Sequence, residues 1–268
     1  MEKLQNKLTD NNLRELKQMT LLIEEYCRPD LIILFGKYAD TTVRSACGGY
    51  ELLVITGKTE ENFKQEDVQE YVYRHYPLSQ RFEQKLFVHL FPRDFFISHI
   101  FRSRFFKNIL TEGVTLHDNG ALSLERFNLR RSVKKKHVEG ADKHAERCEC
   151  IAGMFLRDAE AKTLTSDFRV SGLYLYHALE LLLTALEYRY YGFRREYDHI
   201  SRHFQVAKHA SAELNAFYES RKNEILKMFG RLKKFRDDSM YSETYGYHAE
   251  TVYRYLDIIG KIKTIMTR

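Results

Sequence analysis

The stretch LIILFGKYADTTVRSACGGYELLVIT, residues 31–56, decides how the first part of this chain folds. It begins with a short apolar run, 31–35, and ends within a second run, 50–57, that contains β-branched residues. Such runs are typical of buried strands. Gly36 follows the first run directly, and the connection between the runs is mostly polar. A glycine in a tight turn lets backbone N–H groups approach an anion closely, so the stretch predicts a strand–turn–strand unit shaped for phosphate.

Helical and strand patterns alternate around this stretch. The apolar spacing predicts helices at 11–27, 60–76 and 93–111, and strands at 83–91 and 112–120. Alternation of this kind over about 120 residues predicts one central sheet covered by helices. We therefore expect residues 1–120 to form an α+β domain with a mixed sheet and flanking helices.

The pattern changes after Gly120. The rest of the chain contains no proline and no convincing strand, and its helical spacing predicts helices at 122–138, 141–165, 168–191, 199–210, 214–238 and 246–266. The segment 170–192 is apolar nearly all round, which is typical of the central helix of a bundle. Residues 121–268 are thus expected to form an all-α helical bundle.

Composition and charge restrict the class of protein. The chain is 44% hydrophobic and 30% charged, so it has enough apolar residues to bury a core. Residues 1–120 carry 16 Lys and Arg against 17 Asp and Glu, whereas residues 121–268 carry 27 against 20. The basic second half favours RNA as a partner, with a solvated basic surface as the alternative. The chain lacks an apolar run of the ~20 residues that a membrane span needs, so we expect a cytoplasmic protein without a membrane partner.

The residues 34–55, LFGKYADTTVRSACGGYELLVI, resemble the signature of minimal nucleotidyltransferases of the DNA polymerase β superfamily. In that signature an apolar strand runs into Gly-Ser, and a later strand carries Asp-x-Asp or Asp-x-Glu. The resemblance extends over about residues 10–120. It implies transfer of a nucleoside monophosphate from a nucleoside triphosphate with Mg²⁺, with Glu51 as a catalytic acid. It places the nucleotide site at Gly36, Lys37, Tyr38 and Glu51.

The chain departs from this signature at the metal ligands. Lys37 stands in place of the serine, and Gly49 in place of the first aspartate. Phe87 and His89 stand at the positions where the third acid would lie. Magnesium selects oxygen ligands, and one acid of three is too few to hold two ions, so no metal site is predicted. Three alternatives follow, namely a scaffold, nucleotide binding without transfer through a charge such as Lys37, and active transfer.

The second half resembles another family. Residues 171–204 are similar to the central helix of HEPN domains, which carries a His and a Glu like His177 and Glu180. HEPN domains often accompany minimal nucleotidyltransferases, either fused to them or as toxin–antitoxin partners. Active HEPN ribonucleases use an Arg followed by a polar residue and, four to six residues on, a His; here the corresponding residues are Arg236, Asp237 and Tyr241. A tyrosine with an ordinary pKa of ~10 is a poor general base at neutral pH, so this motif also lacks a catalytic group.

Both resemblances together leave three functions open. The first is a non-catalytic, nucleotide- or RNA-associated regulatory protein, which forms a homodimer through the HEPN helices. The second is an active nucleotidyltransferase that modifies a small molecule or a protein. The third is a HEPN ribonuclease of the toxin–antitoxin type that uses Arg236. The missing acids weaken the second, and the tyrosine at 241 weakens the third, so the sequence favours the first.

Overall fold

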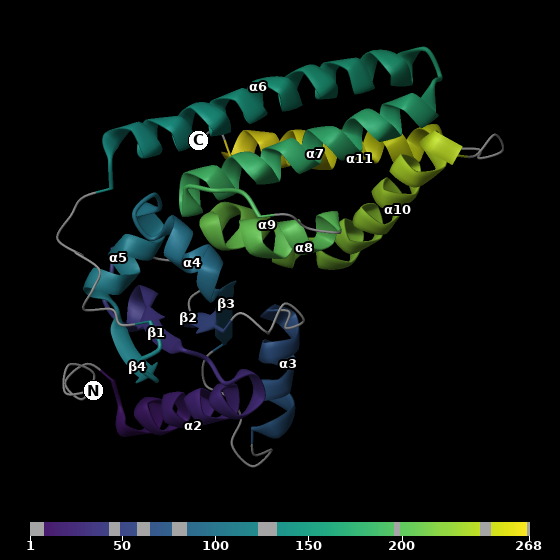
Figure 1. Ribbon diagram of the computed structural model, residues 1–268. Helices are drawn as coiled ribbons and strands as arrows, with labels where there is room; N and C mark the ends of the chain where they lie inside the picture. The colour runs from purple at the N-terminus through teal and green to yellow at the C-terminus, as the bar shows by residue number, and fades with distance from the viewer. Residues whose placement is uncertain are drawn as a thin grey trace. The chain divides into compact units, whose positions relative to one another are not determined.

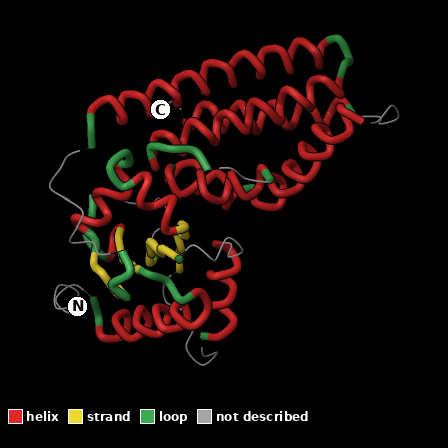
Figure 2. Tube along the Cα trace, viewed as in Figure 1, coloured by secondary structure: helices red, strands yellow, loops and turns green. Residues whose placement is uncertain are grey.

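The computed structural model describes residues 8–42, 49–57, 65–76, 85–122, 133–195, 199–241 and 248–266 (Figure 1). The chain separates into two compact units, Met1–Val138 and Glu139–Arg268. Strands occur only in the first unit among these residues, as Figure 2 shows. A mixed sheet with helices is therefore followed by an all-helical region, and the predicted fold class is confirmed.

The first unit is built on a four-stranded sheet. Its strands are β1 (Leu31–Phe35), β2 (Tyr50–Thr56), β3 (Leu86–Pro92) and β4 (Val114–Asp118), in the order β3-β2-β1-β4. β1 is antiparallel to β2 and to β4, whereas β2 and β3 are parallel, so the sheet is mixed. All residues of β1 and β2 are buried, in agreement with the two apolar runs of the sequence.

Helices α2 (Asp10–Cys27) and α3 (Gln65–His75) supply residues that pack with one face of the sheet. Alternation along the strands sends Ile32 and Leu34 to this face, where Met19 and Val72 belong to the same apolar cluster. The side chain of Thr9 accepts a hydrogen bond from the backbone of Asn12 and so caps α2. The other sheet face is aromatic, with Phe35 in edge-to-face contact with Phe105 at 5.6 Å between ring centroids.

The single helix predicted at 93–111 is wrong, because two helices occupy this segment. These are α4 (Arg93–His99) and α5 (Arg104–Glu112). Ser103 separates them in an extended conformation, and its hydroxyl accepts a hydrogen bond from the backbone N–H of Phe106. A serine in this position caps a new helix. The aromatic residues around it gave no sign of this boundary in the sequence.

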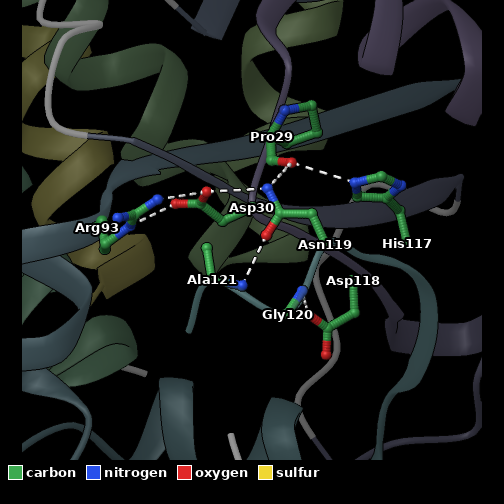
Figure 3. A network of polar contacts seen from close by, with 8 residues as sticks. All are labelled: Pro29, Asp30, Arg93, His117, Asp118, Asn119, Gly120 and Ala121. Carbon is green, nitrogen blue, oxygen red and sulfur yellow. Dashed lines mark hydrogen bonds and ion pairs between the residues drawn. The ribbon is translucent and has the colours of Figure 1, made fainter. Parts of the chain in front are cut away.

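A network of polar contacts connects residues at the end of the sheet opposite to Gly36 (Figure 3). The guanidinium of Arg93, at the start of α4, donates to both carboxylate oxygens of Asp30, at 2.6 and 2.5 Å. Asn119 donates to the same carboxylate at 3.2 Å. The hydrogen bond with Asp30 raises the pKa of Arg93 against the opposing effect of burial. Because Asp30 is 3% exposed, these partners are needed to keep a carboxylate in the interior.

The helical unit is organised around α7 (Phe168–Tyr191), as predicted from its continuous apolar character. α7 contacts the neighbouring helices α8 (Ile200–Ala207), α10 (Lys222–Tyr241) and α11 (Ala249–Met266). It ends at Gly192, whose φ of 81° is the left-handed conformation that glycine tolerates. Gly172 has a packing role, because a Cβ there would lie 2.6 Å from the ring of Phe235.

Two further helix boundaries differ from the sequence expectation. The predicted break between 138 and 141 is wrong, since α6 (Lys135–Leu164) is continuous across it. The single helix predicted at 214–238 is also wrong: it is divided at Arg221 into α9 (Ala212–Ser220) and α10, and the 3-10 turn η3 (Lys208–Ala210) precedes α9. None of the helices in the described ranges is sufficiently long and apolar to cross a membrane.

Candidate functional site

The predicted phosphate turn follows β1 and forms the 3-10 helix η1 (Gly36–Tyr38). Gly36 has a φ of 77°, so its backbone requires glycine. Its N–H donates to the hydroxyl of Thr41 at 2.9 Å, and its carbonyl accepts from the N–H of Thr41 at 3.2 Å. The turn is thus closed by its own hydrogen bonds. The N–H that was expected to meet an anion has an intramolecular acceptor instead.

Glu51 lies beneath this turn. It pairs with Phe35 in the antiparallel register of β1 and β2, and it is 1% exposed. A Cβ placed on Gly36 would be 1.7 Å from the Oε2 atom of Glu51, so the carboxylate rests against the glycine itself. The structure therefore brings Gly36 and Glu51 together, as the sequence predicted, but it buries the carboxylate.

Lys37 and Tyr38 lie differently from Glu51. The side chain of Lys37 is exposed. The ring of Tyr38 packs against that of Tyr50, with 4.8 Å between centroids. Since Tyr50 and Glu51 are successive residues of β2, their side chains point to opposite faces of the sheet. Tyr38 accordingly contributes to the face covered by α2 and α3, whereas Glu51 lies on the opposite face of the sheet.

The positions of the missing acids are filled. A Cβ at Gly49 would lie 2.1 Å from the backbone oxygen of Lys85, so no larger residue fits this backbone. Phe87 pairs with Glu51 in the parallel register of β2 and β3. His89 is 1% exposed and lies among aromatic rings, 5.2 Å from Phe35 between centroids. These positions are thus occupied by packed backbone and aromatic groups.

The donor set does not fit magnesium. The described ranges contain no group of three or more His, Cys, Asp and Glu side chains that could hold a metal ion. Residues 43–48, which lie outside those ranges, contain neither Asp nor Glu. Glu51 is thus the single carboxylate among the positions that correspond to the metal ligands of the nucleotidyltransferase signature, and one carboxylate does not make a two-metal site.

In the helical unit, Arg236 is held by two neighbours. Its Nη1 donates to the hydroxyl of Tyr176 at 2.9 Å, and its Nε donates to Asp237 at 3.0 Å. Burial opposes the charge, but the hydrogen bonds with Asp237 and Tyr176 raise the pKa of Arg236 overall. Tyr241 is the last residue of α10, and its side chain lies outside the described part. Tyr176 is a partner that sequence reasoning missed, because a tyrosine within the apolar α7 gives no distinct signal.

His177 and Glu180 form a separate polar group on α7. His177 Nδ1 lies 3.7 Å from a carboxylate oxygen of Glu180, and Arg194 donates to the same carboxylate at 3.3 Å. The contact with His177 is the main cause that lowers the pKa of Glu180. His199 precedes α8, whereas His203 within α8 faces the buried Glu187 at 3.5 Å. The contact between His203 and Glu187 joins α8 to α7, whereas His177 and Glu180 both lie on α7.

Comparisons with known proteins give little beyond the fold. No protein-family model matches the chain, and no curated protein matches it. Among solved structures, the chain is similar to a nucleotidyltransferase-like protein from Exiguobacterium sibiricum 255-15, with 14% identity and a TM-score of 0.32. The match covers 93% of this chain and 74% of the other. A likeness with so low a TM-score carries no argument about this chain.

Proposed function

We propose that this chain is a non-catalytic, nucleotide- or RNA-associated regulatory protein, built from a degenerate nucleotidyltransferase unit and a HEPN-like helical unit. The observation that supports it best is the packing around Gly49, where a Cβ would lie 2.1 Å from the backbone oxygen of Lys85. An aspartate cannot occupy this position without a shift of β3. The site therefore lacks the room as well as the ligands for metal-assisted transfer.

The state of Glu51 supports the same proposal. A general base or a metal ligand has to reach the substrate or the ion. Glu51 is 1% exposed, and its Oε2 atom lies against Gly36 rather than at an open surface. The carboxylate is thus packed against the turn.

The ribonuclease alternative has less support than the regulatory function. Two N–H groups of Arg236 donate to Asp237, and a third donates to Tyr176, so most of the fork that would hold a phosphate is in use. Asp237 also adds negative charge beside this arginine. Dimerisation through the helices belongs to the proposal, and light scattering at micromolar concentration tests it: a dimer is expected, and a monomer would contradict this part.

The test of the proposal is a transfer assay with ATP, GTP, CTP and UTP, each labelled on the α-phosphate, in Mg²⁺ and in Mn²⁺. We expect no label on the protein or on any added acceptor, together with measurable binding of a nucleotide or of single-stranded RNA. Glu51→Gln serves as the control, because transfer that persists in this variant comes from a contaminant.

Two outcomes would overturn the proposal. Metal-dependent transfer that is lost in Glu51→Gln would establish an active nucleotidyltransferase. RNA cleavage that is lost in Arg236→Ala would establish a ribonuclease. Absence of binding to all four nucleotides and to single-stranded RNA would likewise contradict the association with either ligand.

A further inference from the structure

A polar cleft lies between α10 and α11 in the helical unit. Its volume is about 500 Å³. α10 contributes Asn223, Lys227 and Arg231, which are spaced by four residues and so share one helix face. α11 contributes Thr251, Arg254 and Tyr255. Neither family resemblance assigns a function to this cleft.

The charged side chains of the cleft differ in whether they form ion pairs. Two carboxylates, Glu224 and Glu250, also line it, so its three cations exceed its acids by one. Arg254 forms an ion pair with Glu224, and Arg221 lies 3.7 Å from the same carboxylate. Glu224 is thus shared by two arginines, which leaves it little capacity to neutralise the remaining cations of the cleft.

The two remaining cations are Lys227 and Arg231. Lys227 is exposed and has no ion-pair partner within the described ranges. Arg231 contacts neutral groups: it donates to the hydroxyl of Thr251 at 3.4 Å and hydrogen-bonds to Tyr255. These neutral contacts orient the guanidinium without neutralising it, so it keeps its charge for a ligand.

The size and charge of the cleft fit one class of ligand. Small-molecule sites have volumes of roughly 300–1,000 Å³, and a guanidinium beside an ammonium suits a phosphate group. A long polyanion would need a continuous series of cations, because its affinity grows with each phosphate neutralised. An excess of one positive charge within a bounded cleft instead fits a compact ligand with a single phosphorylated end.

We propose that the α10–α11 cleft binds an organic phosphate of nucleotide size, with Lys227 and Arg231 in contact with its phosphate. Asn223 and Thr251 then hydrogen-bond to the hydroxyl groups of the remainder. This inference rests on the proposed function for the ligand class, and it assigns the binding to the helical unit instead of the turn at Gly36.

Titration calorimetry tests it with AMP, ribose 5-phosphate and adenosine. AMP and ribose 5-phosphate are expected to bind, and adenosine at least tenfold more weakly than AMP, because it lacks the phosphate. Arg231→Gln is expected to weaken AMP binding at least tenfold, and Lys227→Gln severalfold. Lys222→Gln is the matched control, since it removes the same charge from an exposed residue of α10 that does not line the cleft; its affinity should stay within twofold of the unaltered protein.

Several results would overturn the inference. These are equal binding of adenosine and AMP, unaltered AMP affinity in both cleft variants, or an equal loss in Lys222→Gln. RNA binding that depends on Arg231 in the absence of AMP binding would replace the small ligand with a polymer and also overturn it. Thermal unfolding of each variant confirms that it folds, and Lys227→Gln keeps the test valid if Arg231→Gln does not.

The failure of this inference is distinguishable from failure of the proposed function. If Lys37→Ala abolishes nucleotide binding while Arg231→Gln does not, the regulatory function stands and the cleft assignment fails. If Arg231-dependent binding coexists with metal-dependent transfer, the cleft assignment stands and the non-catalytic function fails.

Discussion

The turn at Gly36 and the cleft between α10 and α11 are two regions that could receive a phosphate, and they differ in what their polar groups already do. At the turn, the N–H of Gly36 donates to Thr41, and the carboxylate of Glu51 is buried against the glycine. In the cleft, Lys227 is exposed and Arg231 contacts the neutral side chains of Thr251 and Tyr255. The polar groups of a recognisable motif can thus be engaged within the fold, while a site without a motif keeps charged side chains exposed.

The largest effect is expected for Gly36→Ala. The new Cβ would lie 1.7 Å from Glu51 Oε2, and the φ of 77° is strained for alanine, so the free energy of unfolding should fall by about 4 kcal/mol. Urea denaturation measures this change. Gly230→Ala is the control, because a Cβ there meets nothing within 4 Å and alanine should stabilise α10 by up to about 1 kcal/mol.

The source of that loss can be tested by adding Glu51→Ala. If the turn and the carboxylate are packed against each other, the two losses should not add. The free energy of unfolding of the double variant should then fall by less than the sum of the two single losses, with a difference of more than about 1 kcal/mol. Additive losses would mean that Glu51 does not fill the space beneath the turn.

A smaller loss, about 3 kcal/mol, is expected for Gly49→Ala, because its Cβ would overlap the backbone oxygen of Lys85. The measurement is again the free energy of unfolding. A variant as stable as the unaltered protein would show that this position has room for a side chain. It would then reopen the possibility of a metal-binding aspartate there.

His209 is buried in the helical unit, in contrast to the exposed side chains of the cleft. Burial, with a smaller contribution from Lys208, lowers the pKa of His209 from about 6.5 to about 3. Between these two values the unfolded chain binds a proton that the folded chain does not. His209 should therefore cost no stability above pH 6.5, and stability should fall as the pH decreases through this window, by up to about 1.4 kcal/mol per pH unit.

Unfolding free energies measured from pH 7 to pH 4 check this sign. His209→Gln should reduce the slope, whereas His248→Gln, at an exposed histidine, should leave it unchanged. Equal slopes in the unaltered protein and in His209→Gln would contradict the burial effect.

The smallest effect on stability is expected in the cleft. Arg231 is exposed, and its hydrogen bond to Thr251 is long at 3.4 Å, so Arg231→Gln should change the free energy of unfolding by less than about 0.5 kcal/mol. A loss above about 2 kcal/mol would show that Arg231 stabilises the folded protein, and it would contradict its role in binding a ligand.

Much of the fold was predictable because its signals are local. The apolar runs that became β1 and β2, and the apolar segment that became α7, were found within a residue or two of their observed ends. The division of 93–111 at Ser103 was missed, because the aromatic residues around it dominate the pattern. The continuity of α6 was missed as well, since its boundary depends on tertiary packing that a short window does not contain.

The candidate site was predictable only in part. The sequence placed Gly36 and Glu51 together, because a strand pair fixes their register. It could not show that Gly49 faces the backbone of Lys85, since β3 comes from a distant segment. It also could not bring Lys227, Arg231 and Arg254 to one cleft, because these residues belong to two helices separated by a loop.

The most direct test compares both regions in one titration. Backbone amide shifts of the isotope-labelled protein are followed by NMR as AMP is added. We expect shifts in the amides of α10 and α11 that border the cleft, around Lys227, Arg231 and Thr251, and none from Gly36 to Thr41. Shifts confined to Gly36–Thr41 would contradict it, because they would place the phosphate at the turn whose N–H groups the fold already uses.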